Sequence, residues 1–224
     1  MGEAFADMLP YTVGLIVSPF PVVAVIALLI SANGRAKALL FETTWLIMSW
    51  VVLVVLIMLL GAVGATGHDR PIWVAWLALV IGVLLLAMAF AGIRRAAHRR
   101  QGKAPEVPRW IAAMDTMTTP KIIGVAGLLT VANPVNLASL AGGALAVAHE
   151  PLPLGRRLIL AAVFVVIGSI GVLAPYATAL SAGGDRRLQR MRGWLVQHNG
   201  ALTLLLILVF ALLFLAKGLR ALLS

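Results

Sequence analysis

Long apolar segments separated by short polar ones dominate the pattern of this chain. Six of these segments are long enough to cross a bilayer, because a transmembrane helix needs about 20 mostly apolar residues. The longest polar stretch runs from Arg94 to Arg109. The predicted spans are Phe5 to Ser31, Ala38 to Val63, Ile72 to Ile93, Ile122 to Val147, Leu158 to Leu180 and Ala201 to Leu219. The pattern therefore predicts an all-α integral membrane protein.

Two of the predicted spans are interrupted by proline near their middle. Ser18-Pro19-Phe20-Pro21 interrupts the first span, and Asn133-Pro134-Val135-Asn136 interrupts the fourth. A proline inside a helix removes a backbone hydrogen bond and clashes with the carbonyl one turn back, at about 3 kcal/mol. Because hydrocarbon offers no water to the freed carbonyls, neighbouring helices or a wet cavity must satisfy them. We therefore predict that the first and fourth helices are broken at proline.

The two halves of the chain share three features in the same order. Besides the paired proline breaks, Gly34-Arg35-Ala36-Lys37 matches Gly155-Arg156-Arg157, and Ala91-Gly92-Ile93-Arg94 matches Lys217-Gly218-Leu219-Arg220. Because each half holds an odd number of spans, the two copies must be inverted in the bilayer. The predicted units are a first three-helix repeat at 1–97, a cytoplasmic basic linker with an interfacial segment at 98–120, and a second three-helix repeat at 121–224.

Composition supports the membrane interpretation. Hydrophobic residues make up 62% of the chain and charged residues 12%, where soluble domains carry about 25% charged residues. The net charge of +10 suggests a polyanionic partner. The basic residues nevertheless lie between apolar segments without interleaved aromatics, so we expect contacts with anionic membrane lipid and not with nucleic acid. The first apolar segment has no basic region or cleavage site typical of a signal peptide, and we expect it to be retained.

Basic residues are unevenly divided between alternate loops, and this division predicts the orientation. One set of loops holds twelve Lys or Arg residues and the other holds five, with Lys121 at the head of the fourth span. Because cytoplasmic loops carry the excess, both termini are predicted to lie outside the cytoplasm, in a multi-pass protein of the inner membrane. The twelve are Arg35, Lys37, Arg94, Arg95, Arg99, Arg100, Lys103, Arg109, Arg186, Arg187, Arg190 and Arg192; the five are Arg70, Arg156, Arg157, Lys217 and Arg220.

The residues around the two proline breaks are the candidate substrate-binding residues. They offer hydroxyl and amide groups at mid-membrane depth, and paired breaks in inverted repeats indicate a central transporter site. The half-helices that begin after the prolines would present free backbone N–H groups to an anionic or hydroxylated head group. The alternative is that Ser or Asn merely caps the half-helix that follows it. The predicted set is Ser18, Pro19, Pro21, Thr130, Asn133, Pro134 and Asn136.

Three ionisable residues are candidates for coupling or gating. Glu42 is the carboxylate that the predicted spans place inside hydrocarbon, whereas Glu3 and Asp7 lie at the outer entrance of the first span. Intramembrane carboxylates are usually functional. It could couple transport to protons, pair with Lys121 or Arg35, or lie at head-group level. Asp115 precedes Lys121 by six residues and could cap the fourth helix or form a gating contact.

Other patterns favour packing and disfavour enzymatic chemistry. Gly142-Gly143, and Gly168 with Gly171, suit close helix packing. The chain has no cysteine, its histidines lack metal-ligand spacing, and no nucleophile or phosphate-loop motif occurs. We therefore expect no cofactor, no metal site and no enzymatic activity.

Several of these residues carry a resemblance to a known family. Pro108-Arg109-Trp110, Asp115, Lys121, Gly124 and the two proline breaks resemble the pattern of the glycolipid-addressing (sulfolipid-addressing) proteins of actinobacteria, a branch of the lysine-exporter superfamily. The resemblance implies two inverted three-helix repeats and a role in moving lipid-linked glycans to the cell surface. Val135 stands where the family pattern has Lys, so a charge that could meet an anionic head group is missing.

These observations lead to one functional hypothesis and two alternatives. The hypothesis is a secondary exporter that exposes a site at the paired breaks alternately to each side, with a lipid or glycolipid as cargo. The first alternative is an exporter of a small solute, such as an amino acid or ion, that depends on Glu42. The second is a non-transporting scaffold that binds lipid-synthesis or export machinery through Arg94 to Arg109. All three hypotheses are compatible with a homo-oligomer.

Overall fold

The fold is built from helices, nine of which lie in the residues that the computed structural model describes: 2–63, 72–99, 117–148 and 150–223. No strand occurs in these ranges. The helices are α1 (Gly2–Val17), α2 (Pro19–Ile30), α3 (Gly34–Val63), α4 (Ile72–Arg99), α6 (Thr119–Val131), α7 (Pro134–Val147), α8 (Leu154–Gly168), α9 (Ile170–Leu180) and α10 (Gly184–Leu223).

The helices combine into as many as six membrane spans. α3, α4 and α10 are each long and apolar enough to cross a bilayer, while α1–α2, α6–α7 and α8–α9 are pairs bent by 42°, 61° and 44°. Large apolar side chains face outward; on α3, Leu39, Ile47 and Leu59 are 56%, 61% and 59% exposed. Such a surface suits lipid tails and not water. The predicted all-α membrane protein, with its first and fourth helices broken at proline, is confirmed.

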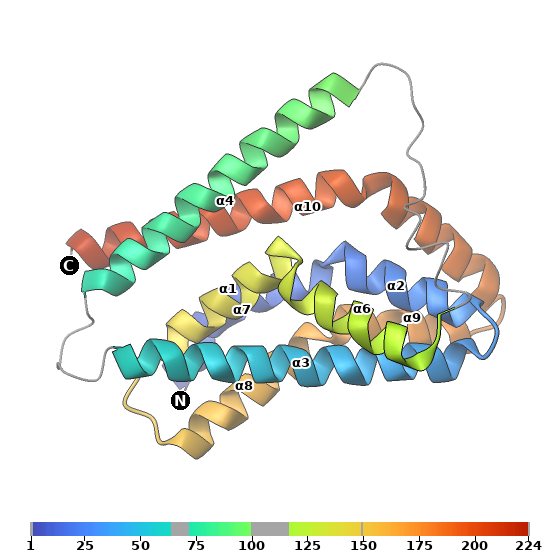
Figure 1. The fold of residues 1–224 in the computed structure, drawn as a ribbon, viewed down its shortest axis with the longest axis horizontal. Coiled ribbons are helices and arrows are strands. Elements are labelled where there is room, and N and C mark those ends of the chain that lie inside the picture. The colour runs from blue at the N-terminus through green and yellow to red at the C-terminus, as the bar shows by residue number, and fades with distance from the viewer. Residues whose placement is uncertain (1, 64–71, 100–116, 149, 224) are drawn as a thin grey trace.

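The chain passes back and forth between two ends of the bundle (Figure 1). α1–α2 run away from the end that holds both termini, and α6–α7 run toward it. The two halves thus have opposite directions and the same element order, as the predicted inverted repeats require. The turns at 31–33 and 181–183, beside the basic residues that begin α3 and α10, lie at the end opposite the termini. The orientation relative to the cytoplasm stays a prediction.

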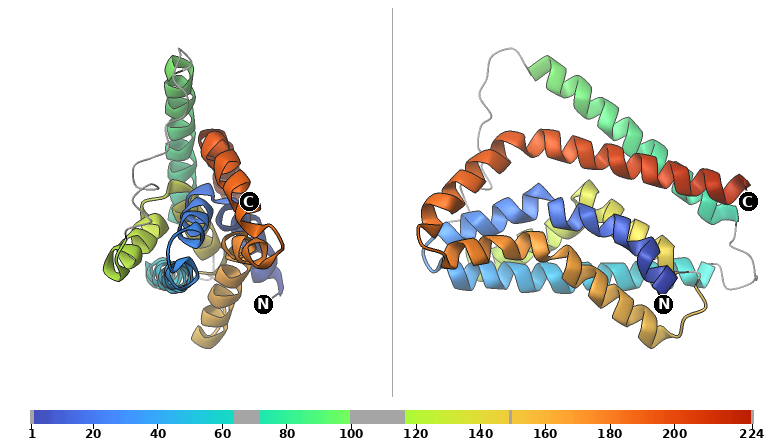
Figure 2. Two further views of the ribbon diagram at one scale, coloured as in Figure 1. Left: turned by 90° about the vertical axis from the view of Figure 1, so that its right-hand side faces the viewer. Right: turned by 180° about the vertical axis from the view of Figure 1, so that it is seen from behind.

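Two helices extend further into basic sequence than predicted. The predicted link from Asp185 to Arg192 is wrong, because these residues form the first turns of the 40-residue helix α10. At 1.5 Å per residue α10 is about 60 Å long, twice the hydrocarbon thickness of about 30 Å, and it curves along its length (Figures 1 and 2). α4 likewise continues through Arg94 to Arg99. Arginine is a good helix former, so a change in polarity did not end either helix.

A third break, which the sequence did not predict, divides the fifth span at Ser169. The Ser169 hydroxyl donates to the Val166 carbonyl at 2.7 Å, and such a bond to the preceding turn bends helices. The Val172 amide donates to the Ser169 carbonyl three residues earlier, which tightens the turn. Pro175 follows inside α9 and has no N–H for the carbonyl one turn back. Hydroxyl and proline together explain the bend.

The broken pairs α1–α2 and α6–α7 lie between α3 on one side and α10 on the other (Figures 1 and 2). α4 packs chiefly on α10, where Gly82 faces Leu215 and Gly218 faces Leu79; a Cβ at these glycines would come within 2.8 Å and 2.6 Å of the leucine side chains. Glycine is needed at such close helix crossings. α4 therefore lies on the outside of α10, and α10 in turn packs against α2 and α7 of the broken pairs.

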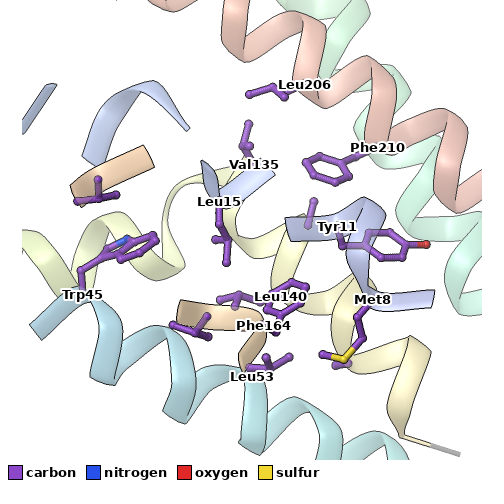
Figure 3. Packing of buried hydrophobic residues seen from close by; sticks show 14 of the residues in the cluster. Met8, Tyr11, Leu15, Trp45, Leu53, Val135, Leu140, Phe164, Leu206 and Phe210 are labelled. Atoms are coloured by element: carbon purple, nitrogen blue, oxygen red, sulfur yellow. The ribbon is translucent and has the colours of Figure 1, made fainter. Parts of the chain in front are cut away.

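Apolar side chains fill the crossing of α1 with α7, α8 and α10 (Figure 3). Tyr11 stacks on Phe210 with ring centroids 6.3 Å apart, and the same ring lies on Gly142, where a Cβ would overlap it. Gly143 faces Phe164 with a Cβ distance of 3.0 Å. The predicted role of the Gly142-Gly143 pair in close packing is confirmed, and it fixes α1 against the second half of the chain.

Candidate functional site

The two predicted breaks meet in the centre of the protein. Ser18 separates α1 from α2, and Asn133 lies between α6 and α7. The Asn133 Nδ2 donates to Ser18 Oγ at 2.8 Å, although the residues are 115 apart in the sequence. Ser18 is 0% and Asn133 4% exposed, so this bond is out of contact with solvent and lipid. The breaks are thus adjacent, as a shared central site requires.

The prolines stand at the starts of the new half-helices. Pro19 and Pro134 occupy the first positions of α2 and α7, where a missing N–H is tolerated and the fixed φ suits a helix. Because proline offers no donor, the carbonyls of Leu15 and Thr130 one turn back lose their helical partners. Pro21 removes another donor from the first turn of α2. The N-terminus of α2 therefore has fewer free backbone N–H groups to offer a head group than predicted from the sequence.

Asn133 both caps α7 and joins the two halves. Its Oδ1 accepts a hydrogen bond from the Val135 amide at 3.0 Å, which is the side-chain cap of a helix N-terminus. The capping alternative is therefore correct for Asn133 but incomplete, because its Nδ2 binds Ser18. Ser18 makes no such cap at α2. Its side chain contributes to the contact between the breaks instead.

Asn136 repairs the backbone that the second break opens. Its Nδ2 donates to the Leu129 carbonyl at 3.2 Å, a group that the Asn133 amide would satisfy in a continuous helix. Its Oδ1 accepts from Asn133 Nδ2 at 3.4 Å. Ser18, Asn133, Asn136 and the Leu129 carbonyl thus form one buried chain of hydrogen bonds, which we call the break network.

The break network does not include two nearby residues: Thr130, which was predicted to belong to the site, and Val135, which follows Pro134. Thr130 is fully buried, and its hydroxyl donates to the Ala126 carbonyl of its own helix at 3.0 Å. Val135, where the resemblance implies a lysine, is fully buried in the apolar cluster (Figure 3). The network is therefore uncharged and flanked by hydrocarbon side chains.

Glu42 is buried between helices, and its depth in the membrane stays a prediction. It is 2% exposed, and neither carboxylate oxygen has a hydrogen-bond partner among the residues that the structure describes. Lys121 and Arg35 are both exposed and do not bond to it, so the predicted pairing with either is not found. Asp115 and the part of the predicted interfacial segment at 110–116 lie outside the described residues, while α6 begins within its last part, at Thr119.

Two buried polar residues of α3 were missed by the sequence analysis. Trp45 Nε1 and Ser49 Oγ are buried and, within the described ranges, have no hydrogen-bond partner. With Glu42 they are spaced by three and four residues, so all three share one helix face; we call them the α3 polar stripe. That spacing was the available signal. Across the same ranges, no three His, Asp or Glu side chains gather as a metal site.

The unpredicted third break lies beside the first. Gly171 at the start of α9 approaches the backbone carbonyl of Ile16 so closely that a Cβ would overlap it. Gly168, before the break, faces Leu15 with a Cβ distance of 2.7 Å. The two glycines were predicted to pack closely, and this is confirmed. All three helix breaks therefore converge on one region of the protein.

Comparison with known proteins gives one result. The model of the family described as Sap, sulfolipid-1-addressing protein, matches residues 8–220, nearly the whole chain. No curated protein and no solved structure matches it. The wider placement in the lysine-exporter superfamily stays a prediction. Taken with the helical membrane fold and the paired breaks, the match shows that the chain belongs to the sulfolipid-1-addressing protein family.

Proposed function

We propose that this protein moves a lipid or glycolipid across the membrane by opening the paired helix breaks alternately to each side. The observation that carries the proposal is the hydrogen bond between Ser18 and Asn133, which joins the two broken helices at their buried centre. Broken helices that meet at mid-depth are typical of transporter binding sites. The family match supports a lipid-related cargo.

In this proposal the described arrangement is the closed state. Opening requires the Ser18–Asn133 bond to break, and hydrogen bonds between membrane helices contribute only about 0.6 kcal/mol on average. The bends of 42° and 61° already divide each helix into two rods. Each half-helix can therefore tilt without unwinding further backbone. The largely apolar surroundings of the break network suit lipid chains better than a hydrated ion.

Thiol cross-linking tests whether the breaks must separate. The chain has no native cysteine, so Ser18→Cys/Asn133→Cys can be bridged by dibromobimane in vesicles of phosphatidylcholine. We expect translocation of a fluorescent glucosyl diacylglycerol, measured by dithionite quenching, to fall at least tenfold on cross-linking. Each single-cysteine variant, treated with the same reagent, should keep the translocation rate that it has before treatment. Full transport by the bridged protein would refute the proposal.

Substitution of the break network tests its role in transport and separates the alternatives. Because these side chains are the proposed polar contacts of the head group once the breaks open, Ser18→Ala, Asn133→Ala and Asn136→Ala should each slow lipid translocation. Unchanged rates in all three would refute the site. A small-solute exporter would instead show saturable amino-acid counterflow that is lost in Glu42→Gln. A scaffold would lose function when the arginines of 94–109 are neutralised and would tolerate changes at the breaks.

A further inference from the structure

Glu42 is a buried carboxyl group without a hydrogen-bond partner. Its side chain is 2% exposed, and neither oxygen makes a hydrogen bond within the part of the chain that the structure describes. An isolated ionised carboxylate is so costly to bury that such a group takes up a proton instead. We therefore expect Glu42 to be a neutral carboxylic acid in the described arrangement.

Among the described residues, the helices that pack on α3 bring no buried cation to Glu42. α3 packs chiefly against α2, α6, α7 and α8, of which α2 and α7 contain no titratable side chain. Lys121 of α6 and Arg156 of α8 are exposed. Arg157 of α8 donates to two carbonyls of the turn before it. It lies against Gly61, which is about 28 Å along α3 from Glu42 at 1.5 Å per residue.

The first turns of α3 and a tyrosine of α9 supply the other titratable groups near Glu42. Arg35 is exposed, and Lys37 precedes Glu42 by five residues, which places it on a different face of the helix. Tyr176 of α9 lies within electrostatic range of Glu42, and its phenol donates to the Arg35 carbonyl at 3.4 Å. Because a phenol is uncharged at neutral pH, Tyr176 does not offset the charge that an ionised Glu42 would carry.

The α3 polar stripe connects Glu42 with the breaks. Trp45 Nε1 and Ser49 Oγ are buried and, in the described ranges, unpaired, and Ser49 lies about 10 Å along α3 from Glu42. α3 packs against α2, α6 and α7, the helices that begin or end at the two proline breaks. Tilting of these half-helices away from α3 would admit water, which the indole N–H, the hydroxyl and the carboxyl group can all bind.

From this we propose that Glu42 is a proton-binding site whose occupancy decides whether the broken helices can close. In the closed state the carboxyl group holds a proton. When water reaches the stripe, the O–H bond of the acid breaks, the proton passes to a water molecule, and a hydrated carboxylate and a hydronium ion remain. Closing requires a hydronium ion to return a proton to the carboxylate, because the ionised group cannot be buried unpaired. The inference rests on the proposed opening of the breaks and adds that each opening releases one proton.

Thiol labelling measures how protonation affects opening. The chain has no native cysteine, so Ser18→Cys places one thiol at the buried first break, where a water-soluble maleimide reaches it only during opening. Ser18→Cys/Glu42→Gln is the reference, since the pH dependence of the thiol itself cancels in the ratio of the two labelling rates. Because opening releases a proton, a higher pH favours opening. We expect the ratio, with glutamate over glutamine, to rise about tenfold per pH unit between about pH 5.5 and 7.5.

Two further variants control this measurement. Asp185 is an exposed carboxylate in the first turn of α10, so Ser18→Cys/Asp185→Asn should keep the full pH dependence. Glu42→Met, which is apolar and of similar length, should label in the Ser18→Cys background as Glu42→Gln does. A ratio that does not change with pH would overturn the proposal, because Glu42 would then carry the same charge in the closed and open states.

Infrared spectroscopy tests the closed state without any change at the breaks. A carboxylic acid and a carboxylate have different carbonyl stretching bands, and water-exposed Asp and Glu are ionised at about pH 7. We expect the purified full chain at this pH to show a carboxylic-acid band that is lost in Glu42→Gln and retained in Asp185→Asn. A wild-type spectrum without this band would overturn the proposal, since Glu42 would then be ionised in the closed state.

The two proposals can fail separately. If cross-linking the breaks leaves translocation intact, the transport proposal fails, while the labelling ratio and the infrared band still decide whether Glu42 binds the proton. If translocation requires the breaks to separate but the labelling ratio is independent of pH, the proton site fails alone.

Discussion

The contact between Ser18 and Asn133 has a measurable coupling energy. Asn133→Ala removes the cap of α7, worth about 1 kcal/mol, together with the 2.8 Å bond to Ser18, worth about 0.6 and at most about 1.7 kcal/mol between membrane helices. We therefore expect the free energy of unfolding to fall by roughly 2 kcal/mol. Ser18→Ala removes only the shared bond and should cost about 1 kcal/mol.

A double-mutant cycle isolates the shared bond from the cap. Once Asn133 is alanine, Ser18→Ala has no hydrogen bond left to remove, so the two losses should fail to add by about 0.6–1.7 kcal/mol. The assay is unfolding by sodium dodecyl sulfate in bicelles, followed by circular dichroism. Both substitutions remove buried polar groups and create little empty volume, so the fold should persist in each variant.

The control for this cycle is a hydroxyl on α1, the helix that ends just before Ser18. Thr12 is buried in α1, and its Oγ1 donates to the Leu9 carbonyl at 2.6 Å and not to another helix. Thr12→Val combined with Asn133→Ala should be additive within about 0.3 kcal/mol. A coupling energy between Ser18 and Asn133 as small as that of this control would refute the claim that the breaks are joined by this bond.

Two further predictions concern contacts around the site. Gly171→Ala places a Cβ on the Ile16 carbonyl, so it should lower the free energy of unfolding by about 1–3 kcal/mol, whereas Gly124→Ala, with nothing within 4 Å, should stay within about 1 kcal/mol of wild type in the same assay. Arg157 donates to two backbone carbonyls of the turn before α8, at 2.9 Å and 3.0 Å; Arg157→Ala should speed proteolysis of that turn severalfold, and exposed Arg156→Ala should not.

The sequence alone predicts the features that local chemistry dictates. A proline cannot donate a hydrogen bond wherever it stands, so the breaks at Pro19 and Pro134 could be located from their positions in the apolar segments. Span lengths follow equally directly from bilayer thickness. The break at Ser169 was missed because a serine bends a helix only when its hydroxyl bonds to the preceding turn. The available signal was Pro175, which lies inside the predicted fifth span six residues after the break.

The polar stripe of α3 was hidden for a different reason. In a soluble helix, polarity distinguishes the core face from the solvent face, but α3 is apolar on nearly all sides because its outer face meets lipid. Glu42 attracted attention as an intramembrane charge. Trp45 and Ser49 share a three- and four-residue spacing with Glu42, but in a helix this apolar the spacing has meaning only once the structure identifies which face of α3 is buried. The same ambiguity kept the contact between Ser18 and Asn133 from being derived, although both were placed at mid-depth.

The contacts between the two halves of the chain differ in strength, and this difference limits the motions by which the proposed transporter could open. The bond between Ser18 and Asn133 is a single hydrogen bond, which thermal energy can break within the membrane. By contrast, Gly142 packs directly against Tyr11, and Gly171 packs directly against Ile16. These helices can slide past each other, but no larger side chain fits in the place of either glycine. Separating the halves as rigid bodies would expose these glycine surfaces and lose their packing. Tilting of α2 or α6 about the breaks would give up the hydrogen bond and part of the packing of these helices on α3, but it would leave the glycine contacts in place. Under the proposed transport, it is the motion by which the centre would open.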